Sequence, residues 1–312
     1  MNFFNPKFWD ENKISLFSIL LYPITLSIKI LFFIKKNLVK NHKFKVPIIC
    51  VGNIYIGGTG KTPFCIELFS ILEKLNKKPG FIRKKYKSFE DEILLLEKSG
   101  KVYQHRKRIE AIKEAINNNH DVLILDDGFQ DLSVEKDLSI ICFNEQQWIG
   151  NGFTIPSGPL REELSSLKRA KYVIINGKKN ENINQKILSK NNKIKIFYAI
   201  FQAENIGKFK DKKIYAFAGI GNPNNFFYTL KKNKINVTQE RYFPDHHNYS
   251  DIEMENLIKK SRDMDATLLT TEKDYCRIKN IYKKDVNFLK INIKMVNENK
   301  FVEDIKKELW KA

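Results

Sequence analysis

The chain contains 312 residues, 42% of them hydrophobic, so it is long enough for two domains of ordinary size, each with its own core. Its formal charge of +19, from 55 Lys and Arg against 36 Asp and Glu, would suit an anionic partner such as a lipid surface or nucleic acid. The excess lysines are spread along the whole chain, which is equally expected of a solvated surface. The four cysteines are far apart and lie mostly in apolar segments, which argues against disulfides and zinc sites.

Residues 1–45 are predicted to form a membrane-associated segment. Residues 14–34 are apolar apart from Lys29, and the run reaches the roughly 20 residues that a membrane span needs, although Pro23 and Lys29 weaken it. No small-residue cleavage site follows, so a removed signal peptide is not expected. The alternative is a buried core helix. Lysines that would attract anionic headgroups on the cytoplasmic side follow the run at Lys35, Lys36, Lys40, Lys43 and Lys45.

The next part of the chain alternates between strand-like and helix-like segments. Its apolar runs are continuous rather than alternating, which predicts strands buried on both faces of a parallel sheet. Residues 62–77 place apolar side chains on one helical face that would pack on this sheet. The predicted strands are residues 46–51, 121–126, 138–143 and 172–176.

A second series of strands and helices indicates a second domain. It follows the polar residues 177–193 and a connecting or edge segment, so the first domain is predicted at 46–205 and the second at 206–312. Ser250 and Glu253 form a capping-box pattern that predicts a helix to about Arg262. The other predicted elements are strands at 213–220, 266–271 and 286–292, and a helix at 223–232.

A glycine-rich stretch between the first predicted strand and the first predicted helix has the features of a phosphate-binding loop. Glycines allow backbone N–H groups to turn toward phosphates, and a helix N-terminus favours anions. A lysine would reach the terminal phosphates and a threonine hydroxyl would bind Mg²⁺. A strict motif has another glycine where this chain has Tyr55. The predicted ligands of the nucleotide are Gly57, Gly58, Thr59, Gly60, Lys61 and Thr62.

Such a loop requires a carboxylate at the end of another buried strand. Asp126 and Asp127 follow the four apolar residues 122–125 and could hold Mg²⁺ directly or through water, together with Thr62. Either motif alone would be weak. Together they predict Mg-nucleotide binding with phosphoryl transfer or hydrolysis.

Six motifs stand out in order along the chain: VGNIYIGGTGKTP, DDGFQ, GNGFTIPSGPLRE, AFAGIGNP, FPDHHNYSD and LLTTEKDYCRI. Together they resemble the tetraacyldisaccharide 4′-kinases, the lipid A 4′-kinases of Gram-negative bacteria. In that family the position of Tyr55 is also not glycine.

The resemblance implies a P-loop NTPase-like α/β/α sandwich, a second, smaller α/β domain joined by a two-stranded linker, and an active site in the cleft. It implies transfer of the ATP γ-phosphate to the 4′-hydroxyl of tetraacyldisaccharide 1-phosphate, a step of lipid A biosynthesis. The enzyme would work at the cytoplasmic face of the inner membrane, held there by its N-terminal segment. Neither nucleic acid nor an obligate protein partner is expected.

The resemblance also implies catalytic roles for three residues. Arg161 is a bidentate donor suited to a phosphate oxygen, the alternative being an ion pair with Glu162 or Glu163. Asp91 matches the family's base, and His246 matches the histidine that pairs with it. An imidazole can orient a carboxylate and share its proton.

Some positions leave the assignment of these roles open. His247 could be the functional ring in place of His246. Where the family has Arg-Gly-Tyr-Gly, residues 83–86 read Arg-Lys-Lys-Tyr, and Glu90 replaces the glycine before Asp91, so the local backbone must differ.

Two motifs of the second domain receive no role. Residues 219–223 are interpreted locally as a strand-to-helix turn, and residues 272–274 as a solvated turn.

Two other classes of function remain to be weighed. A switch or partitioning ATPase acting at a membrane or on nucleic acid usually carries a signature lysine before the paired glycines, where this chain has Ile56. A basic nucleic-acid-binding module would leave Lys61 and Asp126 unexplained, and the chain has no basic motif interleaved with aromatic residues.

Overall fold

The computed structural model describes residues 6–11, 13–85 and 90–310. Contacts divide the chain into two units that interleave along the sequence. The larger unit contains Asn5–Lys87, Ser99–Ile200 and Ile293–Ala312. The smaller unit contains Ser88–Lys98 and Phe201–Asn292.

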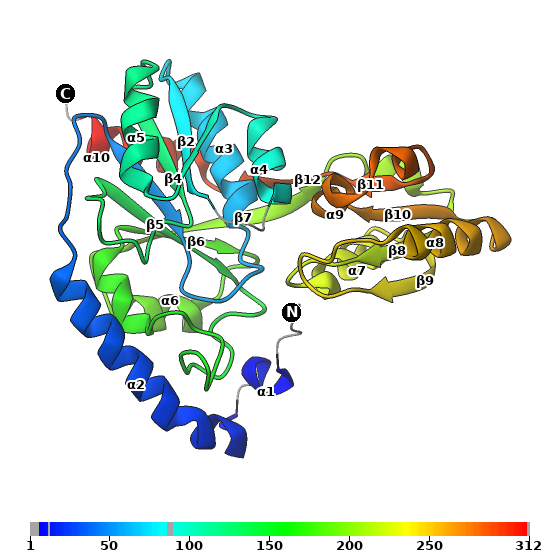
Figure 1. The fold of residues 1–312 in the computed structure, drawn as a ribbon, viewed down its shortest axis with the longest axis horizontal. Helices are drawn as coiled ribbons and strands as arrows, with labels where there is room; N and C mark the ends of the chain where they lie inside the picture. The colour runs from blue at the N-terminus through cyan, green and yellow to red at the C-terminus, as the bar shows by residue number, and fades with distance from the viewer. Residues whose placement is uncertain (1–5, 12, 86–89, 311–312) are drawn as a thin grey trace. The chain divides into compact units, whose positions relative to one another are not determined.

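The larger unit is built on a sheet with eight strands in its described residues (Figure 1). The strand order is β12-β7-β6-β5-β1-β4-β2-β3, and the printed pairings from β7 through to β3 are parallel. The strands are β1 (Ile48–Gly52), β2 (Pro79–Lys84), β3 (Val102–His105), β4 (Val122–Asp126), β5 (Leu138–Asn144), β6 (Tyr172–Asn176), β7 (Lys195–Ala203) and β12 (Ile291–Met295).

Helices cover both faces of this sheet, because its central strands are apolar on both sides. One face packs against α5 (Arg108–Asn117) and α6 (Glu181–Leu188). The other face packs against α3 (Lys61–Lys74) and α10 (Glu298–Leu309), whose Phe64 and Phe301 rings meet edge to face. The result is the predicted α/β/α sandwich, whose parallel strands end in loops at one edge.

The smaller unit contains a second parallel sheet, with strand order β11-β10-β8-β9 in its described residues. Alternate residues of β8 pack against α7 on one face and α8 on the other. The helix α4 packs against α9. These elements are α4 (Glu90–Glu97), β8 (Lys213–Ala218), α7 (Pro223–Lys232), β9 (Asn236–Tyr242), α8 (Asp251–Asp263), β10 (Thr267–Thr271), α9 (Glu272–Arg277) and β11 (Asn287–Leu289).

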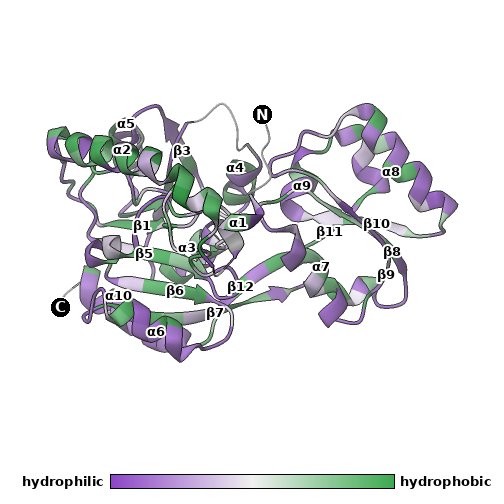
Figure 2. Cartoon of the chain, turned by 90° about the horizontal axis from the view of Figure 1, so that it is seen from below, coloured by the Kyte–Doolittle hydropathy of each residue, from purple (hydrophilic) through white to green (hydrophobic). Residues whose placement is uncertain are grey.

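The N-terminal part of the chain forms a short helix α1 (Lys7–Asp10) and a long helix α2 (Leu16–Leu38). Figure 2 shows that α2 is coloured mostly as hydrophobic. Most of its large apolar side chains are exposed, whereas its buried side chains are Ser18 and Thr25. By length and composition α2 is able to cross a membrane. Its exposure contradicts the alternative of a buried core helix.

The predicted fold class is confirmed, and the capping box at Ser250 and Glu253 is present. The predicted strand at 286–292 is wrong as a single element, because the chain forms β11 and then β12 on different sheets. The strand β9 was not predicted, because its side chains are polar and mostly exposed at the edge of the smaller sheet.

Candidate active site

The chain turns sharply between β1 and α3, at a segment called here the glycine turn (residues 57–60). Gly57, Gly58 and Gly60 have φ angles of 75°, 65° and 84°, in the left-handed region where a side chain is strained. The helix α3 begins at Lys61, directly after the turn. The first N–H groups of a helix have no partner within the helix, so they are available to an anion at this point.

Three amide side chains hold the glycine turn in place. Asn53 donates a hydrogen bond to the Thr59 hydroxyl at 3.1 Å, and Asn176, the last residue of β6, donates to the Thr59 carbonyl. Gln130 donates to the carbonyl of Asn53 at 2.9 Å. Sequence reasoning missed these residues, although Asn53 and Gln130 lie within the quoted motifs and Asn176 ends a predicted strand.

Asp127 lies beside two cationic side chains of the larger unit. Its carboxylate is 3.4 Å from Nζ of Lys61 and accepts hydrogen bonds from Arg161 at 2.8 and 2.9 Å. The alternative ion pairs of Arg161 are not formed, because Glu162 pairs with Arg169 and Glu163 with Lys29. Lys61, Arg161 and Asp127, far apart in sequence, therefore form one charged cluster.

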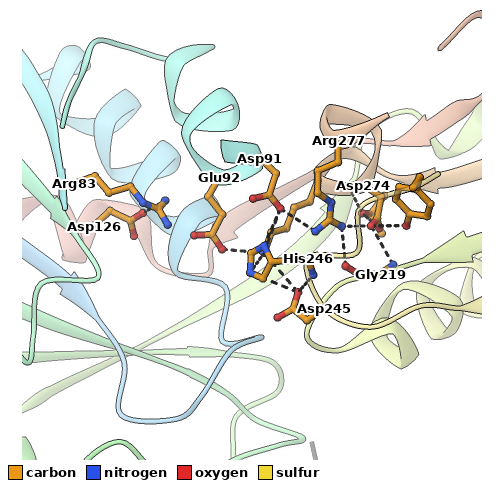
Figure 3. A network of polar contacts seen from close by, with 12 residues as sticks. Arg83, Asp91, Glu92, Asp126, Gly219, Asp245, His246, Asp274 and Arg277 are labelled. Carbon is orange, nitrogen blue, oxygen red and sulfur yellow. Dashed lines mark hydrogen bonds and ion pairs between the residues drawn. The ribbon is translucent and has the colours of Figure 1, made fainter. Parts of the chain in front are cut away.

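Asp126 has a different environment from its neighbour. It is 1% exposed, and one of its oxygens lies 2.7 Å from Arg83, itself almost buried at the end of β2 (Figure 3). Residues 83–86 and Glu90 differ from the family pattern, so the backbone there was expected to differ from that of the family. Arg83 and Lys84 remain in the strand, whereas residues 86–89 lie outside the described residues. Of the two predicted carboxylates, Asp127 is the accessible one.

Replacing Arg83 with alanine is expected to lower the free energy of unfolding by about 3–5 kcal/mol, because it removes the guanidinium from a buried carboxylate. Urea unfolding followed by tryptophan fluorescence measures the change. The control is Lys171→Ala, which breaks a half-exposed pair with Glu308 and should cost less than about 1 kcal/mol. Equal losses in the two variants would contradict a stabilising role for the buried pair.

The smaller unit brings three cationic or titratable side chains around Asp91. The Asp91 carboxylate is 1% exposed, and its Oδ2 lies 3.3 Å from Nδ1 of His246, 3.2 Å from Arg277 and 3.7 Å from Lys273 (Figure 3). The predicted pair of Asp91 and His246 is therefore present. His247 instead contacts Glu253 at 3.1 Å, which favours His246 as the functional ring.

Arg277 connects Asp91 to a second buried carboxylate, Asp274. Asp274 is fully buried and contacts Arg277. The expectation of a solvated turn at residues 272–274 is therefore wrong: these residues begin α9, and the buried Asp274 anchors that helix to the sheet. Its further donors are the backbone N–H of Gly219 at 3.1 Å and the hydroxyls of Tyr249 at 2.8 Å and Thr271 at 2.6 Å.

The cations around Asp91 decide its protonation. Burial by itself raises the pKa of Asp91, but its contact with His246 and the charges of Lys273 and Arg277 outweigh burial and lower the pKa below the usual value. Burial by itself lowers the pKa of Lys273, but the negative charges of Glu92, Asp245 and Asp91 outweigh burial and raise the pKa. Asp91 is therefore ionised at neutral pH and can accept a hydrogen bond from a hydroxyl.

Comparison with known proteins identifies the family. The sequence matches LpxK, described as tetraacyldisaccharide-1-P 4′-kinase, over residues 16–310. The chain belongs to this family. Among curated relatives, the tetraacyldisaccharide 4′-kinase of Pelagibacter ubique is 41% identical over 296 residues, covering 94% of both chains. The tetraacyldisaccharide 4′-kinase of Rickettsia akari is 34% identical over 318 residues, covering 95% of this chain and 96% of that one.

A solved structure of LpxK from Aquifex aeolicus, in complex with ATP, has the same fold. It matches with a TM-score of 0.69 at 24% identity and covers 94% of this chain and 98% of its own. The chain is therefore a tetraacyldisaccharide 4′-kinase that acts in lipid A biosynthesis, as the sequence motifs predicted. The switch or partitioning ATPase is not favoured.

Proposed function

We propose that the larger unit binds ATP with its phosphates in the glycine turn. The main observation behind this proposal is that Lys61 and Arg161 both pair with Asp127. This cluster follows a turn whose glycines have positive φ angles that other residues adopt only with strain. Two cations at the start of a helix suit the charge of a triphosphate. ATP in the Aquifex aeolicus LpxK complex supports this choice of nucleotide.

The same residues fit Mg²⁺, which prefers oxygen ligands and usually takes one or two carboxylates together with substrate phosphates. Thr62, at the start of α3, and Asp127 would hold the ion, and the buried Asp126 would complete its environment. Among the described residues, no group of three or more His, Cys, Asp or Glu is arranged to hold a metal ion. When bound, Mg²⁺ would neutralise charge on the phosphates.

We infer that Asp91 and His246 bind the acceptor hydroxyl and remove its proton. Asp91 orients the 4′-hydroxyl by accepting its hydrogen bond, and it takes the proton as the new O–P bond forms and the bond from the γ-phosphorus to ADP breaks. His246 holds the carboxylate through the contact at 3.3 Å and shares the proton. Since a phosphoryl transition state is loose, the low pKa of Asp91 suits orientation followed by late proton transfer.

The test is an assay in detergent micelles with γ-labelled ATP and tetraacyldisaccharide 1-phosphate. We expect label on the 4′ position only when Mg²⁺ is present, and no stimulation by DNA. ATP hydrolysis that responds to DNA, with no labelled glycolipid, would overturn the proposal.

We propose that α2 holds the kinase at the cytoplasmic face of the inner membrane, with its exposed apolar face in lipid. Leu20 and Leu31 are 65% and 66% exposed, and lysines lie in the last turn. A lipid acceptor requires the enzyme to reach the bilayer, and an apolar helix followed by lysines favours anionic headgroups. The glycolipid and the membrane surface are thus the proposed partners, with no obligate protein partner.

Replacing Leu20 and Leu31 together with glutamate is expected to lower vesicle binding at least tenfold, because two apolar side chains would carry charge into the lipid. Co-sedimentation with vesicles of phosphatidylethanolamine and phosphatidylglycerol measures the bound fraction. Leu188→Glu, an exposed position on α6, is the control and should bind like wild type. Equal binding of both variants would exclude α2 as the attachment site.

A further inference from the structure

The helix α2 contacts the rest of the larger unit through two small polar side chains, through a ring contact of Tyr22 with Phe153 and through an ion pair of Lys29 with Glu163. Ser18 and Thr25 are its fully buried side chains, while most of the large apolar side chains around them are exposed. They are seven residues apart, which places them on the same side of the helix two turns apart. A helix that packs on a soluble core would bury its apolar face instead, so this polar face is a specific docking surface.

The partner of this polar face is the segment called here the 151–161 loop. The hydroxyls of Thr25 and Ser157 lie 2.8 Å apart, and the Ser157 N–H donates to Thr25 at 3.2 Å. Thr25 also reaches the carbonyl of Thr154 at 3.4 Å. Both side chains are fully buried, so their hydroxyls depend on these contacts for their hydrogen bonds.

A second contact lies two turns toward the start of α2. Asn151 donates to the hydroxyl of Ser18 and to the carbonyl of Ser157, both at 3.0 Å. Asn151 also accepts a hydrogen bond from the N–H of Phe153 at 3.1 Å. The loop is thus held to α2 at both buried positions of the helix, Ser18 and Thr25.

The other end of the 151–161 loop pairs with the chain that leads into the glycine turn. Ile56 donates to the carbonyl of Pro159 at 3.0 Å, and Arg161 donates to the carbonyl of Ile54 at 2.7 Å. Tyr55 and Leu160 form an antiparallel bridge between these two bonds, and both side chains are buried. The loop ends at Arg161, whose side chain contacts Asp127.

We propose that Thr25 and Ser157 are positioning residues of the kinase, which hold the 151–161 loop so that it supports the glycine turn and aims Arg161. The contact between α2 and the loop thereby contributes to the affinity for Mg-ATP. The helix that is proposed to lie in the bilayer also stabilises the nucleotide site. By linkage, bound nucleotide strengthens the docking of α2 by the same factor. This inference rests on the proposed role of residues 57–62 and of Arg161.

The test measures nucleotide affinity in the full chain purified in detergent micelles. The probe is Mg²⁺ with adenylyl imidodiphosphate, a non-hydrolysable ATP analogue, titrated by calorimetry into wild type, Thr25→Val and Ser157→Ala. We expect the Kd to rise about 5- to 30-fold in both variants, since each loses buried hydrogen bonds of the hydroxyl pair. The KM for ATP should rise with the Kd, while kcat changes less.

Two further variants separate positioning from folding. Thr25→Ser keeps the hydroxyl and should restore the Kd to within about twofold of wild type. Ser27→Ala removes an exposed hydroxyl that bonds to Pro23 within the same helix, and it should bind like wild type. If Thr25→Val fails to fold, Ser157→Ala carries the test.

The possible outcomes distinguish this inference from the proposed function. Lys61→Ala is the control for the nucleotide site and should not bind the probe. With that control in place, an unchanged Kd in a folded Thr25→Val or Ser157→Ala protein overturns the inference. A wild-type protein that does not bind the probe overturns the proposed nucleotide site itself. A raised Kd in Ser27→Ala as well would show a general effect on α2 and also overturn the inference.

Discussion

Lys61→Ala is expected to lower kcat/KM for ATP-dependent phosphorylation by about 10³-fold or more, to the limit of detection. Lys61 is the first residue of α3, and its Nζ lies 3.4 Å from Asp127 in the charged cluster that includes Arg161. In the proposed site, its ammonium stabilises charge that develops on the transferred phosphoryl group. Alanine removes this stabilisation, and the micelle assay with labelled ATP measures the loss.

The control for this prediction is Lys74→Ala, which removes a lysine from the other end of the same helix. Lys74 is 65% exposed and pairs with Glu298 at 3.5 Å, so its loss should leave kcat/KM within about twofold of wild type. Lys61→Ala should retain the wild-type melting temperature within a few degrees, because its ion pair is only partly buried. Activity of Lys61→Ala near that of wild type would refute the assignment of the glycine turn as the phosphate site.

Asp91→Asn is expected to lower kcat by about 10²- to 10⁴-fold, because an amide cannot accept the proton of the 4′-hydroxyl. The KM for ATP should change little, since Asp91 is not among the residues proposed to hold the nucleotide. Rapid-quench measurement of phosphoryl transfer separates this effect from product release. The control is Glu97→Gln, an exposed carboxylate of the same helix α4, with activity expected near that of wild type.

The lowered pKa of Asp91 predicts how kcat and stability depend on pH. A carboxylate whose pKa is lowered in the folded state stays ionised until the pH falls below the usual value of about 4. Protonation of Asp91 therefore should not limit kcat between pH 6 and 9, and the stability that its ion pairs contribute is lost only as the pH falls through the lowered pKa. A wild-type loss of kcat near pH 7 that vanishes in Asp91→Asn would contradict this assignment.

The nucleotide half of the site follows from features that are local in the sequence. A continuous apolar strand, glycines at 57, 58 and 60, and a lysine at the start of an amphipathic helix specify a strand, turn and helix within about 25 residues. The two aspartates at the end of β4 were equally visible, because they come directly after an apolar run. Parallel strands that are buried on both faces end at a common edge, which predicts that these aspartates lie near the glycine turn. Six motifs in order then indicated the family before any contact was known.

The sequence by itself determined the fold class, the glycine turn, the carboxylates at the end of β4 and the apolar character of α2. Only the tertiary structure decided which charges meet: Asp126 with Arg83, Asp127 with Arg161, and Asp91 with Arg277. It also placed residues 88–98 with the smaller unit and residues 293–312 with the larger one. Patterning reports how a residue relates to its neighbours along the chain, whereas an ion pair or a docked hydroxyl depends on segments that only packing of the core brings together.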